Sequence, residues 1–246
     1  MLRDKSRNEI QTLMDVALGR QAADTVLVDA DLVNVYSGEI QKHQSVAIKG
    51  PWIAYVGPDA ARMIGPQTER IEAGGKTLIP GLIDGHTHIA WLYSAPEFVR
   101  FVAPGGTTLV ITEALEPYPV AGCEGVMDFL DSLRDQPIKI LATAPGMASI
   151  STAARGIAGR DLERLLERDD ILGLGETYWQ EVLKYPDVYL DAMAAALNRG
   201  KLLEGHTAGA KDAKLNAYIA TGISSCHEPI NADQVAAGVR LGLYIM

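Results

Sequence analysis

The chain has 246 residues, of which 48% are hydrophobic and 22% are charged, and its formal net charge is −9. These values are typical of a soluble globular protein and exclude a disordered or fibrous chain. The acidic balance, without a stripe rich in Lys and Arg, argues against nucleic-acid binding. The two cysteines, Cys123 and Cys226, are too few and too far apart for a disulfide framework or a zinc ribbon.

The first residues carry charges throughout and show no apolar core or cleavage site, which argues against a signal peptide. No segment approaches the roughly 20 apolar residues that a membrane span requires. We therefore expect a cytoplasmic protein with no membrane partner.

Residues 1–76 are expected to form a helix followed by a small β domain. Leu2 to about Arg20 has apolar residues at near-helical spacing, which indicates an amphipathic helix. From Asp24 onward, short runs rich in Val and Ile are broken by Ser-Gly and Gly-Pro, a pattern that predicts an antiparallel β-meander. We interpret the segment as a small β-sandwich-like domain.

From residue 77 to residue 246 the pattern alternates between short apolar runs and amphipathic segments of helical length, such as 119–134, 159–168 and 189–200. Such alternation indicates βαβ units and a parallel sheet, here a (β/α) barrel of the TIM type. About seven strands can be counted, and a closed barrel requires eight. The barrel is therefore expected to be truncated at its C-terminus, with its remainder beyond Met246.

Four of the five histidines end predicted strands, and so does one glutamate. These five residues are His86, His88, Glu176, His206 and His227. Strand C-termini of a (β/α) barrel converge on one face, where catalytic groups lie. A single histidine after an apolar run is more often a core or loop residue, but this set together predicts a metal centre. Imidazoles with a carboxylate suit zinc, iron or manganese better than calcium or magnesium.

Several motifs resemble the amidohydrolase superfamily, and in particular its bacterial adenine deaminases. The motifs are PGLIDGHTH at 80–88, LGLGE at 172–176, EGHTAGAKDAKLNAYIATGISSCHE at 204–228 and the opening run DVALGRQAADTVLVDADLVNVYSGEI. The resemblance implies a metal-dependent hydrolase of purine metabolism that converts adenine and water to hypoxanthine and ammonia. It also implies a small-molecule substrate, and we expect a homo-oligomer.

The resemblance further implies two divalent transition-metal ions, manganese or iron, with zinc as another possibility. His86 and His88 would hold one ion, His206 and His227 the second, and Glu176 would bridge the pair and take part in catalysis with His206 and His227. The family's last ligand, an aspartate after strand eight, would lie beyond Met246.

Four further residues are candidates for the pocket, each with a structural alternative. Glu228 follows His227 and either contacts substrate or transfers a proton, or else faces away from the site, because strand side chains alternate. Glu113 and Glu116 are either substrate-binding acids or the start of a loop and helix. Trp91 is either a stacking platform for a flat ring or a packing residue.

Three segments depart from the adenine deaminase pattern, namely the residues after His88, the segment 113–116 and the segment 142–147. All three lie at or after strand ends, where substrate is bound. One alternative is therefore an amidohydrolase that cleaves another carbon–nitrogen bond, in a cyclic amide or acylated amine, with the same binuclear site. Another is a non-catalytic binding protein built on a decayed barrel.

Overall fold

The computed structural model describes residues 5–147 and 156–246. The chain forms two compact units that divide between Pro80 and Gly81. Within the described ranges, no helix is both long and apolar enough to cross a membrane.

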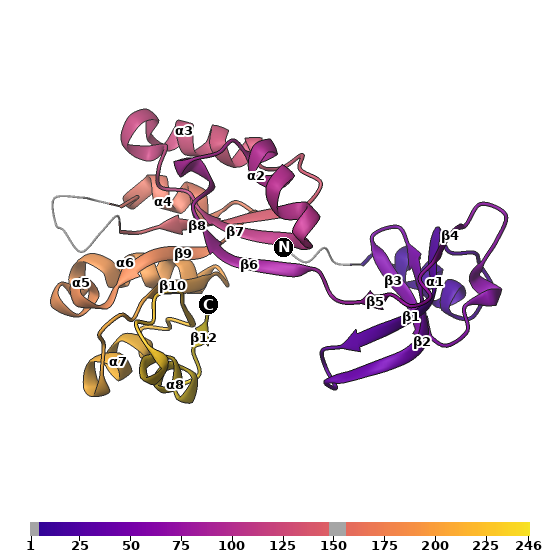
Figure 1. The fold of residues 1–246 in the computed structure, drawn as a ribbon. Helices are drawn as coiled ribbons and strands as arrows, with labels where there is room; N and C mark the ends of the chain where they lie inside the picture. Colours follow the sequence, from indigo (N-terminus) through magenta and orange to yellow (C-terminus); the bar gives the residue numbers. More distant parts are fainter. Residues whose placement is uncertain (1–4, 148–155) are drawn as a thin grey trace. The chain divides into compact units, whose positions relative to one another are not determined.

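The N-terminal unit is a single five-stranded sheet with one helix (Figure 1). Its elements are α1 (Arg7–Ala17), β1 (Thr25–Asn34), β2 (Glu39–Lys49), β3 (Trp52–Gly57), the 3₁₀ turn η1 (Ala61–Met63), β4 (Glu69–Glu72) and β5 (Thr77–Leu78). The strand order is β3-β2-β1-β4, with β5 also paired to β1. The β1–β2 and β2–β3 pairs are antiparallel, as the meander pattern predicted, whereas β4 and β5 run parallel to β1.

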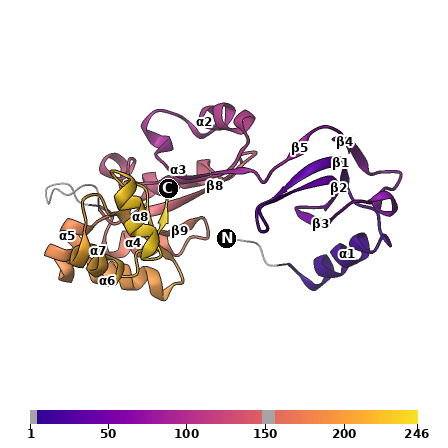
Figure 2. The ribbon, with the colours of Figure 1, turned by 60° about the horizontal axis from the view of Figure 1, so that its bottom comes forward.

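Helix α1 starts at a capping box, in which Ser6 accepts from the Glu9 amide and Glu9 reaches back to the Ser6 amide. Its buried Val16 joins Val26 of β1 and Ala47 of β2 in the core of this unit, and Figure 2 shows the helix along one face of the sheet. The expectation of a sandwich was wrong for the described residues, because a helix supplies the second layer that the sheet needs.

The second unit is a curled sheet of seven parallel strands in sequential order from β6 to β12. The strands are β6 (Leu82–Thr87), β7 (Thr107–Glu113), β8 (Lys139–Pro145), β9 (Ile171–Tyr178), β10 (Leu202–His206), β11 (Ser225–Cys226) and β12 (Tyr244–Ile245). Strands that follow each other as parallel neighbours, each joined by a helical crossover, are the βαβ arrangement that the sequence predicted.

The helices of this unit lie along the outside of the curled sheet (Figure 1). They are α2 (Ala95–Val102), α3 (Tyr118–Ser132), α4 (Gly159–Leu166), α5 (Trp179–Lys184), α6 (Pro186–Asn198), α7 (Asp212–Ile219) and α8 (Ala232–Arg240), with the 3₁₀ turns η2 (Ile89–Trp91) and η3 (Ala103–Gly105). Their apolar faces pack on the strands in one continuous core, represented by Val110 of β7, Leu130 of α3 and Leu174 of β9. The strand C-termini are thereby fixed on a common rim.

The run TLIPGLIDGH, predicted as one barrel strand, is divided between the two units. Thr77 and Leu78 form β5 and pair with Asp31 and Leu32 of β1. The barrel sheet begins only with β6 at Leu82. The intervening Ile-Pro-Gly segment separates the two strands, since Pro cannot donate to a sheet ladder.

Candidate metal centre

Two β-bulges shape the rim where the predicted ligands lie. In β6, Asp84 pairs with Val110 and Thr87 with Thr112, so Gly85 and His86 together oppose one residue of β7. An extra residue of this kind re-aims the side chains around it, and bulges are frequent next to active sites.

The second bulge is in β9, where Gly175 and Glu176 lie opposite a single residue of β10. Glu176 has φ +48°, a left-handed conformation that non-glycine residues adopt at a cost. A side chain at position 175 would run into the Glu113 carboxylate and the Thr143 hydroxyl, which explains the glycine there. The bulge turns the Glu176 carboxylate toward the histidines.

The four rim histidines all direct the same ring nitrogen at Glu176. The Nε2 atoms of His86 and His88 lie 3.7 and 3.5 Å from Glu176 Oε1, and that of His227 lies 3.9 Å from it. His206 Nε2 lies 2.8 Å from Glu176 Oε2. Four imidazole nitrogens, from the ends of β6 and β10 and from the segment after β11, therefore surround one buried carboxylate.

The opposite ring nitrogens contact other carboxylates. His88 Nδ1 lies 2.6 Å from Glu116 Oε1, and His206 Nδ1 lies 2.9 Å from Glu228 Oε2. His227 Nδ1 lies 2.9 Å from Glu204 Oε1. A carboxylate on Nδ1 favours the tautomer that leaves Nε2 free to bind a cation, a common arrangement in metalloproteins.

The electrostatics of the cluster favour positive charge. Burial opposes the charged form of His88, but its hydrogen bonds to Glu116 and Glu176 raise its pKa to about 10. Burial raises the pKa of Glu176 and hydrogen bonds from the histidines lower it, so that the pKa lies well below its usual value. The pKa of His206 is raised, because its hydrogen bonds to Glu176 and Glu228 outweigh the effect of burial. A bound cation would supply the positive charge that the histidine protons supply here.

Three sets of side chains bring their ligand atoms within 4.8 Å of one another and could hold a metal ion. The sets are His86, His88 and Glu176; Glu176, His206 and His227; and His86, Glu204 and His227. The first two share Glu176. Imidazole with carboxylate fits a divalent transition metal, since it offers nitrogen donors together with an anionic oxygen.

A cavity of about 540 Å³ opens beside the histidines. Trp91, Glu116, Tyr178 and Glu228 line it together with the rim histidines. The Trp91 ring stacks on His88 at a centroid distance of 4.5 Å, and Tyr178 stacks on His206 at 4.0 Å and donates its hydroxyl to Glu176. The cavity is therefore lined by the aromatic rings of Trp91 and Tyr178 and by the carboxylates of Glu116 and Glu228, next to the histidine cluster.

Comparison with known proteins agrees with this geometry. The chain is 32% identical over 249 residues to an adenine deaminase of Cenarchaeum symbiosum, a match that covers 100% of this chain and 41% of that protein. It is 36% identical over 241 residues to an adenine deaminase of Moorella thermoacetica, with 95% of this chain and 40% of that protein covered. The chain resembles adenine deaminases. It spans about 40% of the length of these curated relatives, and no family model matches it.

Solved structures share the fold at low sequence identity. The β-aspartyl dipeptidase of Fervidobacterium islandicum AW-1 superposes with a TM-score of 0.60 at 16% identity, covering 90% of this chain and 63% of that one. The N-acetyl-D-glucosamine-6-phosphate deacetylase of Mycobacterium smegmatis gives a TM-score of 0.59 at 19% identity, with coverages of 90% and 67%. At these identities the likeness concerns the fold alone, a curled sheet of parallel strands with helices along its outside.

The structure places three of the four pocket candidates, Glu228, Trp91 and Glu116, at the cavity. Glu228, which follows β11 and His227, lines the cavity. Trp91 lines the cavity with its side chain largely exposed, and Glu116 lines it while contacting His88. Cys226 is buried and accepts hydrogen bonds from Thr207.

The expectation that Glu113 binds substrate was wrong. Its side chain is completely buried at the end of β7, does not line the cavity and accepts a hydrogen bond from the Thr143 hydroxyl. Burial, with the nearby charge of Glu176, raises its pKa well above the usual value. Glu113 therefore lies behind the cluster, because β7 ends with this side chain turned into the sheet interior.

Two residues of the site were missed in the sequence. Glu204 lies two residues before His206, and Tyr178 lies two residues after Glu176. Alternate residues of a strand point to the same side, so the spacing that linked His86 to His88 could have identified both.

Proposed function

We propose that this chain carries the binuclear metal site of a hydrolytic adenine deaminase, which converts adenine and water to hypoxanthine and ammonia. The observation that carries the proposal is the convergence of four Nε2 atoms on Glu176. All of this chain aligns with 41% of a curated adenine deaminase at 32% identity. His86 and His88 would hold one divalent ion, His206 and His227 the other, and Glu176 would bridge them.

Two such ions, manganese or iron in our proposal, would activate water, because binding to a catalytic metal lowers the pKa of water to about 7. The chain's own residues supply orientation. Trp91 offers a flat face on which a purine ring can stack. The cavity that it lines is large enough for a single heterocycle. Glu116 lines the same cavity, and its Oε2 has no hydrogen-bond partner among the described residues.

Glu228 is our candidate for proton transfer at the departing amino nitrogen. Its side chain is 58% exposed and faces the cavity, and one oxygen contacts His206. Proton delivery by a positioned carboxyl group within hydrogen-bond reach is the step that makes ammonia a good leaving group.

An assay of the purified protein loaded with manganese or iron tests the proposal. We expect ammonia release from adenine and none from a panel of lactams, hydantoins and acylated amino acids. A preparation shown to contain two ions per chain that releases no ammonia from any aminopurine would contradict it. Activity on the panel instead would favour the alternative amidohydrolase reaction.

A further inference from the structure

We propose that Glu204 is a positioning residue that sets the orientation of one histidine from each half of the metal centre. This inference rests on the proposed binuclear site. Glu204 Oε1 lies 2.9 Å from His227 Nδ1 and 3.2 Å from His86 Nδ1. One carboxylate oxygen is thus within reach of two ring N–H groups, on rings that belong to different ligand sets.

The two rings form a clamped pair. His86 and His227 stack face to face with centroids 3.4 Å apart and an interplanar angle of 11°. Their Nε2 atoms face Glu176 and their Nδ1 atoms face Glu204. The pair is therefore bounded by a carboxylate at each edge, and rotation of either ring would break a contact on both sides.

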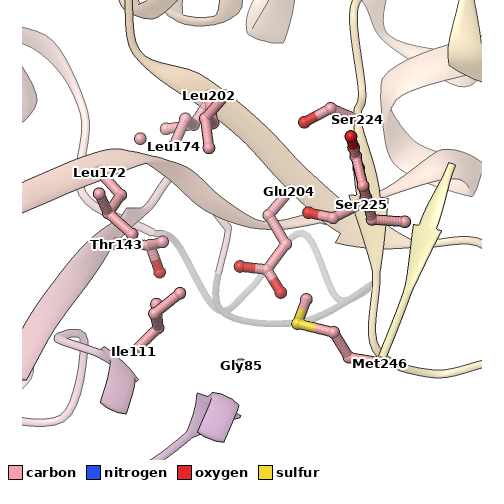
Figure 3. A pocket seen from close by; sticks show the side chains of 12 residues that line it. Gly85, Ile111, Thr143, Leu172, Leu174, Leu202, Glu204, Ser224, Ser225 and Met246 are labelled. Atoms are coloured by element: carbon pink, nitrogen blue, oxygen red, sulfur yellow. The ribbon is translucent and has the colours of Figure 1, made fainter. Parts of the chain in front are cut away.

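Glu204 is itself held in place. It is 5% exposed, and its carbonyl oxygen accepts a hydrogen bond of 2.7 Å from Thr177 Oγ1 of the neighbouring strand. Figure 3 shows its carboxylate projecting into the interior of the curled sheet, between Thr143 and Met246. At the next residue, Gly205, any side chain would run into Thr177 and Tyr218, so the backbone of β10 is fixed closely against β9.

The contacts distinguish a positioning role from direct ligation. Glu204, His86 and His227 could also hold an ion of their own. Such an ion would occupy the Nδ1 atoms, while the Nε2 atoms of the same rings face Glu176. If the Nε2 atoms hold the two proposed ions, an ion on the Nδ1 atoms would also require both rings to lose both N–H protons, whereas two N–H donors on one carboxylate oxygen require no such loss.

Glu204 also differs from the other two carboxylates on Nδ1 atoms. Glu116 contacts only His88 among the rim histidines, and Glu228 contacts only His206. Each of them serves one histidine of one ligand set. Loss of Glu204 should therefore weaken the binding of both ions, and loss of Glu116 should weaken one.

The experiment is a titration of the metal-free protein with Mn²⁺ or Co²⁺ against a chelating dye, for the wild type and for Glu204→Gln and Glu204→Asp. We expect two ions in the wild type, and in Glu204→Gln an affinity lower by about 10–100-fold at both sites, the usual cost of removing such a partner. The visible absorption bands of both bound Co²⁺ ions should shift. Glu204→Asp keeps the charge and should restore part of the affinity.

Glu181→Gln is the matched control, because Glu181 is a buried glutamate that contacts none of the histidines in the described part of the chain. It should bind both ions as the wild type does. Far-UV circular dichroism and the thermal midpoint of each metal-free variant report folding separately from metal affinity.

The inference is overturned if Glu204→Gln binds both ions with wild-type affinity. It is equally overturned if the variant loses one ion while the other binds unchanged, since Glu204 would then act on a single site as a ligand. A wild-type protein that binds no metal would instead refute the proposed function.

Discussion

The two ends of the barrel sheet differ in how their charged side chains are paired. At the strand N-termini, the Arg168 guanidinium contacts Asp170 at 2.7 Å and Asp131 at 2.8 Å, and Arg134 lies 3.0 Å from Asp170. Lys201 donates there to two backbone carbonyls. At the C-terminal rim, five carboxylates lie within 4.0 Å of a ring nitrogen of the four histidines, namely those of Glu113, Glu116, Glu176, Glu204 and Glu228. The rim also contains two bulges and the left-handed backbone of Glu176.

One end is a closed set of ion pairs, and the other is a cluster of carboxylates and imidazoles in which bound protons, or a bound cation in their place, balance the negative charge. In a (β/α) barrel the C-terminal face carries function and the N-terminal face stability. Substitutions at the two ends should therefore separate metal binding from folding.

The largest effect is expected for Glu176→Gln, because Glu176 is common to two ligand sets. The neutral amide should lose both ions, and deaminase activity should fall by about 1000-fold or more, which corresponds to about 4 kcal/mol of transition-state stabilisation. Elemental analysis measures the number of bound ions, and the ammonia assay measures the activity. Retention of two ions with full activity would remove Glu176 from the centre.

Glu116→Gln should act on one half of the centre. Its contact of 2.6 Å with His88 Nδ1 is the only one it makes with a rim histidine in the described structure. We expect about 10–100-fold weaker binding of one ion, measured by the same dye titration. Equal weakening of both ions would mean that the halves are coupled through more than Glu204 and Glu176.

Asp170→Asn should act at the other end and on folding alone. The substitution removes the carboxylate that contacts Arg168 and Arg134, and hydrogen bonds to charged groups contribute about 1.5–3 kcal/mol each. Because these groups are partly exposed, we expect the free energy of unfolding to fall by about 1–2 kcal/mol in total. Urea denaturation measures this change, and metal affinity should stay at the wild-type value.

The smallest effect is a dependence of stability on pH. Burial raises the pKa of Asp170, but hydrogen bonds from Arg168 and Arg134 lower it by more than burial raises it. The folded-state pKa therefore lies below the ordinary 3.8. Its contribution is therefore present above the unfolded-state pKa and lost as the pH falls through the folded-state pKa. Denaturation curves from neutral to acidic pH should show this loss in the wild type and not in Asp170→Asn.

Much of the rim could be predicted from the sequence, because its histidines follow apolar runs and the topology of parallel strands brings such ends together. Glu204 was predictable in principle from its spacing to His206. The burial of Glu113 was not, because it depends on what faces it across the sheet, namely Thr143 and the absent side chain of Gly175. The pairing of Thr77 and Leu78 with β1 likewise depends on a contact between segments distant in the chain.

The bulges at Gly85–His86 and Gly175–Glu176 limit which changes of length the chain tolerates during evolution. A one-residue deletion in either strand would shift the register and turn every later side chain of that strand to the opposite face. Insertions and deletions should therefore be absent from these two strands in functional homologues, while the segments that connect strands to helices vary freely in length. Point substitutions can change the pocket, but the number of residues in β6 and in β9 should stay constant.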